Sequence, residues 1–134
     1  MKPIDSYIVR RYIEYTIYRL TIYKETIYMN DLYALTETTY YILLALVKPC
    51  HGYGIMQTVE KLSNERIHLA AGTLYGALNA LVDKGWITQL PVEAGSRRKQ
   101  YVLTDDGMDI LENELERLRE LVSNGEAVLK GESK

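Results

Sequence analysis

Apolar positions recur along the middle of the chain at spacings that predict an alternation of helices and short strands. The segment Thr36–Val47 is apolar almost throughout and is followed by Pro49, so a buried helix whose N-cap is its first residue is expected. Residues 53–62 carry apolar side chains at helical spacing, which predicts a short amphipathic helix. Between these helices Cys50–Gly52 is predicted to be a turn, and the alternating Ile67–Leu69 further on to be a short strand.

The next helix, predicted over Gly72–Lys84, has two contrasting faces. Leu74, Leu78 and Leu81 lie within about 60° of one another at 100° per residue, which marks a face for the core. The opposite face is small or polar, and Gly85 is suited to end the helix. The outward residues are Gly72, Gly76, Asn79 and Asp83, with Thr73 and Tyr75 beside them.

A basic hairpin is predicted after this helix. Residues 86–90 and 100–103 have strand character, and the segment between them holds a Gly-Ser tip and three cations. Taken alone, such a charge run is usually a solvated surface. At a hairpin tip, however, like charges repel one another unless a polyanion lies opposite, which favours phosphate contact. The tip residues are Gly95, Ser96, Arg97, Arg98 and Lys99.

Thr104 is predicted to cap a last helix over residues 105–123, whose acidic first turn suits the helix dipole. Apolar residues recur in this helix with the spacing of a coiled-coil seam. Burying each such side chain contributes roughly 1.5–3 kcal/mol, whereas association costs about 4–15 kcal/mol, so dimerisation is expected. Part of the seam is also expected to pack on the chain's own helix over residues 36–47. The seam residues are Met108, Leu111, Leu115, Leu118 and Val122.

The first 28 residues differ in character from the rest. Thr-Ile-Tyr occurs three times with a period of five, which fits neither the helix nor the strand period. Lys24-Glu25 can be encoded by a ribosome-binding sequence, so one hypothesis makes Met29 the natural start and residues 1–28 translated upstream DNA. The other interpretation is an N-terminal strand or helix, which the β-branched and aromatic content permits. Both interpretations stay open.

Size and composition limit the class of protein. With 134 residues, 47% hydrophobic and 25% charged, the chain suits one globular domain. No apolar run reaches the roughly 20 residues that span a bilayer, so no membrane association is expected. One cysteine and two histidines argue against a disulfide framework or a metal centre. No signal-peptide pattern is present, so a cytoplasmic location is expected. The sequence contains no nucleophile elbow, P-loop or zinc-protease motif, so we expect neither an enzyme nor a cofactor.

The net charge of −2 hides an uneven distribution. Residues 51–104 carry six basic and four acidic side chains, whereas residues 105–134 carry four basic and nine acidic ones. An acidic last helix can lie away from DNA while the basic middle segment faces it, so the total charge does not exclude nucleic-acid binding.

The order of helix, helix, short strand, helix and hairpin predicts a mainly α fold with a small β-hairpin. This is a winged helix-turn-helix, here followed by a C-terminal dimerisation helix. In such a fold one helix enters a major groove about 12 Å wide, and the hairpin reaches phosphates or the minor groove. Interior glycines cost roughly 1 kcal/mol each of helix stability, which close approach to DNA at Gly72 and Gly76 would explain. Asn79 carries an amide suited to adenine.

Five short motifs, in order along the chain, resemble those of the PadR-like transcriptional regulators, and the resemblance covers roughly residues 33–125. They are Tyr53-Gly54-Ile55, Gly72-Thr73-Leu74-Tyr75 with Leu78 and Leu81, Gly85, Arg97-Arg98-Lys99-Gln100-Tyr101, and Leu103-Thr104 with Gly107. The resemblance implies a dimeric winged-helix repressor, often tuned by a small ligand, of the subfamily with one C-terminal helix. It also implies that Thr73 and Tyr75 contact phosphates and that Arg97–Lys99 form the wing. Residues 1–28 have no counterpart in the pattern.

Three segments are therefore expected: an N-terminal extension over 1–28, a DNA-binding domain over 29–104, and a dimerisation helix with its tail over 105–134. The expected function is that of a homodimeric repressor of transcription on an inverted-repeat operator in double-stranded DNA, with release by a small effector. The alternative is a protein-interaction module that uses the winged-helix dimer without DNA. The expected DNA-contacting residues are Thr73, Tyr75, Gly76, Asn79, Ser96, Arg97, Arg98 and Lys99.

Overall fold

The computed structural model describes residues 6–23, 34–92, 94–95 and 97–131, which belong to two units with a boundary between residues 34 and 35. Helix α1 (Ser6–Tyr23) lies in the first unit, and several of its apolar side chains, Tyr7 and Tyr12 among them, are exposed. A helix here agrees with one of the two interpretations of the N-terminal segment. Met29 lies outside the described residues, so the start-site hypothesis stays a prediction.

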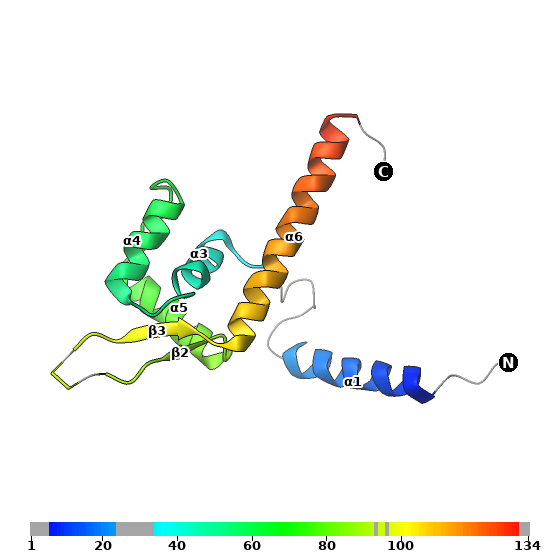
Figure 1. The fold of residues 1–134 in the computed structure, drawn as a ribbon, viewed down its shortest axis with the longest axis horizontal. Helices are drawn as coiled ribbons and strands as arrows, with labels where there is room; N and C mark the ends of the chain where they lie inside the picture. Colours follow the sequence, from blue (N-terminus) through cyan, green and yellow to red (C-terminus); the bar gives the residue numbers. More distant parts are fainter. Residues whose placement is uncertain (1–5, 24–33, 93, 96, 132–134) are drawn as a thin grey trace. The chain divides into compact units, whose positions relative to one another are not determined.

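The second unit has the predicted order of helices and hairpin, but its additional short strand lies before α4 and not after it. It contains a small three-stranded antiparallel sheet among helices, which confirms the mainly α fold class (Figure 1). No helix in the described part of the chain is long and apolar enough to cross a membrane. The elements are α3 (Glu37–Ala45), β1 (Cys50–His51), α4 (Gly52–Leu62), α5 (Ala71–Asp83), β2 (Ile87–Gln89), β3 (Gln100–Leu103) and α6 (Asp105–Leu129).

Both predicted threonine caps are present. The Thr36 hydroxyl accepts a hydrogen bond from the Thr39 N–H at 3.1 Å and starts α3. The Thr104 hydroxyl likewise accepts from the Gly107 N–H at 3.1 Å and starts α6. Each cap satisfies one of the N–H groups that have no partner within the helix, so both helix starts follow from local sequence.

Two strand predictions were wrong. Cys50–His51, predicted to be a turn, forms β1 and pairs with β3 in the register Cys50 with Tyr101 and His51 with Gln100. Ile67–Leu69, predicted to be a strand, pairs with no strand in the described part of the chain and leads into α5 through Ala70, whose backbone is extended. The order of the sheet is β1-β3-β2, so both edges of the central strand β3 are already occupied by β1 and β2.

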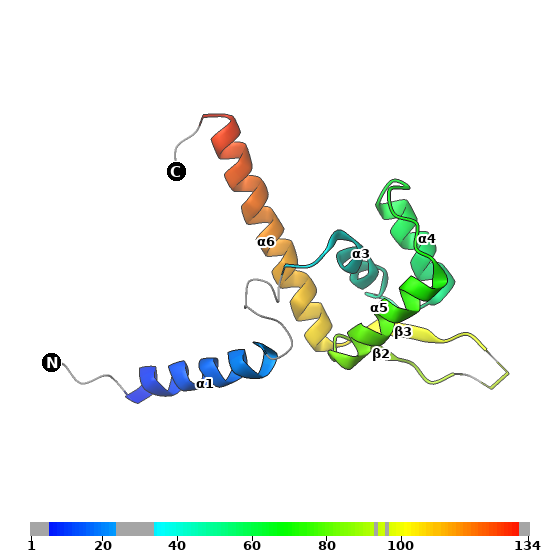
Figure 2. The ribbon, with the colours of Figure 1, turned by 180° about the vertical axis from the view of Figure 1, so that it is seen from behind.

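The core gathers the inward faces of all the helices of the second unit. The predicted inner face of α5 is buried, as are the first residues of the hairpin. Helix α5 and the hairpin lie side by side in the views of Figure 1 and Figure 2. This packing fixes which side of α5 remains outside. The buried apolar residues are Ile42, Leu43, Leu46, Ile55, Val59, Leu74, Leu78, Leu81, Trp86, Ile87, Tyr101, Ile110, Leu111 and Ala127.

Helix α6 is joined to the rest of the unit by a buried carboxylate that the sequence did not reveal. Glu114 is 1% exposed, and its Oε2 accepts a hydrogen bond from the Leu35 N–H at 2.8 Å. Arg117 donates to both carboxylate oxygens, with Nη2 at 2.9 Å from Oε2. A buried charge with such partners is held in place. Glu114 therefore ties the middle of α6 to the segment that enters α3.

Candidate nucleic-acid interface

The outer face of α5 is open to solvent, as predicted. Thr73, Tyr75, Gly76 and Asn79 are all exposed, while the leucines on the other side are buried. A Cβ added at Gly76 would have no other atom within 4 Å. The chain's own packing therefore does not require a glycine at this position. A glycine inside a helix lowers the stability of the helix, so its presence here has a reason other than packing.

Tyr75 links α5 to the start of α4. Its hydroxyl lies so close to Gly52 that a Cβ added there would be 2.5 Å from the hydroxyl oxygen. Only a residue without a side chain leaves room for this contact. Gly52 thus allows the Tyr75 hydroxyl to reach the first turn of α4.

The three predicted cations lie in the part of the hairpin loop that leads into β3. The hairpin turns near Gly95, whose φ of +84° suits a residue without a side chain. Arg97, Arg98 and Lys99 follow and are exposed. Ser96, which was also expected to contact DNA, lies outside the described residues.

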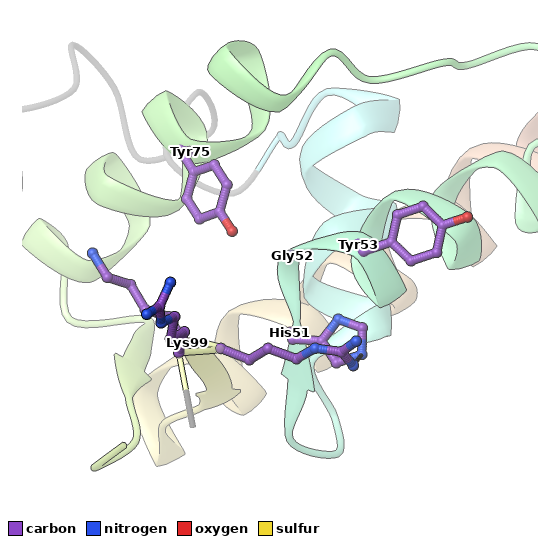
Figure 3. A pocket seen from close by; sticks show the side chains of 7 residues that line it. His51, Gly52, Tyr53, Tyr75 and Lys99 are labelled. Carbon is purple, nitrogen blue, oxygen red and sulfur yellow. Dashed lines mark hydrogen bonds between the residues drawn. The ribbon is translucent and has the colours of Figure 1, made fainter. Parts of the chain in front are cut away.

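The outer side of α5, the start of α4 and the hairpin border one hollow, which we call the basic cleft. Its volume is about 520 Å³. Figure 3 shows Tyr75 reaching from α5 toward the start of α4, with Lys99 and His51 at the same hollow. No carboxylate is among its described lining residues. These residues are His51, Gly52, Tyr53, Tyr75, Arg97, Arg98 and Lys99.

His51 was not predicted to belong to the site. It is the N-cap of α4, and its Nδ1 accepts a hydrogen bond from the Gly54 N–H at 3.1 Å. Its Nε2 lies 3.4 Å from Nη1 of Arg98. The one signal in the sequence was a polar residue directly before a helix, which is the ordinary place of an N-cap.

Cys50, next to His51, is a packing group. Its thiol is half-buried against Gly54 and donates a long hydrogen bond to the His51 carbonyl at 3.5 Å. Burial raises the pKa of the Cys50 thiol. The thiol therefore stays protonated near neutral pH, and the thiolate is the reactive form.

A model of the transcriptional regulator PadR-like family matches residues 41–113 of the chain, which include α5, the basic cleft and the first turns of α6. The chain belongs to this family. Membership confirms the family that the motifs indicated. It also confirms that the chain is a regulator rather than an enzyme.

Solved structures of this PadR-like family resemble the chain. A PadR family transcription regulator from Clostridium difficile is 28% identical, with a TM-score of 0.60 over 70% of this chain and 99% of that one. PadR from Bacillus subtilis, solved in complex with operator DNA, is 29% identical, with a TM-score of 0.50 over 57% of this chain and 45% of that one. An uncharacterized 37.1 kDa transposon protein from Streptomyces fradiae is 39% identical over 74 residues, 54% of this chain. The chain covers only 20% of that protein's length.

In this PadR-like chain the predicted seam of α6 divides into two parts. Leu111 is 5% exposed and packs in the chain's own core, and Met108 is half-buried. Further along, Leu115 is 38% and Val122 59% exposed, with Leu118 half-buried between them. Helix α6 also continues beyond the predicted end at residue 123, through Gly125 to Leu129. The part of the seam open to a partner is therefore its C-terminal part.

Proposed function

We propose that the protein is a homodimeric transcriptional repressor that binds an inverted-repeat operator in double-stranded DNA. The observation that carries this proposal is the basic cleft, where Tyr75 from the exposed face of α5 and three cations of the hairpin adjoin without a described carboxylate among them. Duplex DNA presents a groove that accepts a helix, flanked by phosphates that attract such cations. The co-crystal structure of the related Bacillus subtilis PadR with operator DNA supports this choice of partner.

In this proposal α5 enters the major groove. Asn79 is exposed and can make two hydrogen bonds to an adenine edge. Thr73 and Tyr75, at the first turns of the same helix, contact the phosphates beside the groove. Gly76, on the outer side, allows the helix backbone to approach the bases.

The exposed stripe of α6 supports a homodimer. Leu115, Leu118 and Val122 lie on one side of α6, and burial of such side chains against a second copy provides roughly 1.5–3 kcal/mol for each fully buried residue. A two-fold dimer places two α5 helices about one DNA turn, ~34 Å, apart. The proposal therefore includes an operator with inverted half-sites.

A small effector would act through the same dimer. A ligand that changes the angle between the two DNA-binding units changes the spacing of the two α5 helices and so releases the operator.

The alternative function, a protein-interaction module, uses the α6 stripe and the hairpin without DNA. Fluorescence anisotropy with random duplex DNA discriminates the two, because only the regulator gains salt-sensitive binding.

The proposal is tested with the duplex upstream of the protein's own gene, by footprinting and by anisotropy over a salt series. If each protomer neutralises about three phosphates, the logarithm of affinity falls with that of salt at a slope of about −5 for the dimer. Binding to neither this duplex nor random DNA at low salt would refute the proposed function.

Arg97→Ala is expected to weaken binding to specific and random duplexes alike. A dimer loses two phosphate contacts, so the salt slope becomes less steep by about 2. Lys61→Ala is the matched control, because it removes the same charge from the last turn of α4, outside the cleft. Unchanged affinity and slope in Arg97→Ala would rule out this phosphate contact.

Gly76→Ala is expected to separate stability from binding. The new methyl group meets no atom within 4 Å, so the helix gains about 1 kcal/mol and the melting temperature rises. The same methyl group holds α5 away from the base edges, so affinity for the operator falls about tenfold. Gly125→Ala on α6 also meets open space and is expected to raise stability alone. Full operator affinity in Gly76→Ala would contradict close approach at this position.

A further inference from the structure

We propose that His51 is a phosphate-binding residue, whose neutral ring donates a hydrogen bond from Nε2 to a phosphodiester oxygen held jointly with Arg98. The inference rests on the proposed function, since the phosphodiester is that of the bound duplex. It adds to the DNA contacts the N-cap residue of α4, which lies outside both the hairpin loop and α5.

The position of the proton follows from the helix cap. Nδ1 of His51 accepts from the Gly54 N–H at 3.1 Å and therefore carries a lone pair. A neutral imidazole has one donor and one acceptor nitrogen, so its proton is on Nε2. The cap thus fixes the tautomer, and Nε2 is a donor.

A second donor lies beside this one. Nη1 of Arg98 is 3.4 Å from Nε2, and a guanidinium can only donate hydrogen bonds. Two donors do not bond to each other. An acceptor oxygen between these two groups can accept from Nε2 and from Nη1 alike, and a phosphate oxygen carries the charge that the arginine prefers.

The surroundings favour an anion at the same place. The Tyr75 hydroxyl lies at Gly52, and Lys99 lines the same cleft, where no described side chain is acidic (Figure 3). The cleft also lies at the start of α4, an 11-residue helix whose positive dipole end adds to the field of these cations. Donors from three parts of the fold therefore line the same cleft.

The choice of histidine fits both tasks. Ser, Thr, Asn and Asp are the usual N-caps, but Asp would add a negative charge to the cleft and the others are too short to reach past the helix start. Histidine accepts with one nitrogen to cap α4 and donates with the other, on the far side of the ring.

His51→Asn tests the inference, because asparagine is among the best N-caps and retains an acceptor for the Gly54 N–H while losing the distal donor. The variant is expected to melt near the wild-type temperature and to bind the operator duplex roughly tenfold more weakly. Since no charge is removed, its salt slope stays that of the wild type. Arg98→Ala, the companion variant, loses affinity and also shows a less steep slope.

Side-chain ¹⁵N NMR of the wild-type protein supplies a second readout that does not need a variant. It is expected to find the His51 proton on Nε2, and inorganic phosphate as the probe is expected to shift that signal. The inference would be overturned if a folded His51→Asn variant bound the operator as tightly as the wild type does. It would also be overturned if the His51 proton were found on Nδ1. If wild type binds no duplex at all, the proposed function fails instead, and the phosphate titration still decides whether His51 contacts an anion.

Discussion

Replacing Leu115 and Val122 together by aspartate is expected to yield a folded monomer that binds an inverted repeat at least about 100-fold more weakly than wild type. Both side chains are exposed on α6, so the change costs the single chain little. In a dimer it places four carboxylates in an apolar interface, which desolvation strongly opposes. Loss of the dimer removes the linkage between two half-site contacts, which typically provides 10²–10⁴-fold in affinity.

Light scattering coupled to size-exclusion chromatography measures the assembly, and anisotropy measures the affinity. Asn113→Asp with Asn124→Asp is the matched control, because it adds the same two charges on the opposite side of α6. The control is expected to remain a dimer. A Leu115→Asp and Val122→Asp variant that stays dimeric would contradict the proposed interface.

Gly107→Ala is expected to destabilise the protein by more than about 3 kcal/mol and to lower its melting temperature by roughly 10 °C or more. Gly107 lies in the first turn of α6, where an added Cβ would be 1.9 Å from the Trp86 carbonyl oxygen. This oxygen already accepts a hydrogen bond from the Thr104 N–H at 3.0 Å, so it is held in place by backbone. The methyl group can be accommodated only if the start of α6 moves away from the Trp86 backbone, directly before β2.

Thermal unfolding followed by circular dichroism checks this expectation, and Gly125→Ala is the control within the same helix. A Cβ at Gly125 meets nothing within 4 Å, so this variant gains the ordinary alanine preference of about 1 kcal/mol. Equal melting temperatures for the two variants would mean that the close contact at Gly107 is absent in solution.

The sequence predicted those parts of the fold that depend on neighbours along the chain. The two faces of α5 follow from helical periodicity, and the starts of α3 and α6 follow from Thr36 and Thr104, because a cap acts within one turn. Strand β1 could not be predicted in this way. A two-residue strand has no periodicity, and Cys50–His51 is a strand only because β3, about 50 residues later, lies beside it.

The candidate site likewise has parts that depend on neighbours along the chain and parts that depend on distant residues. The exposed face of α5 and the three cations could be found because each is a local pattern, whereas His51 could not, because its second neighbour is Arg98 in the hairpin. Glu114 was hidden for a related reason. It lies among the acidic residues of α6 that resemble a solvated face, and its partner is the backbone of Leu35, 79 residues away.

The Glu114 contact has a mechanical consequence. Its carboxylate accepts a hydrogen bond from the backbone just before α3, while the start of α6 is held by the Trp86 carbonyl, between α5 and β2. Helix α6 is thus attached to the rest of its unit at two points, at its start and in its middle. If a second chain turns the free end of α6, we therefore expect the rotation to reach the segments before α3 and after α5 through these two contacts.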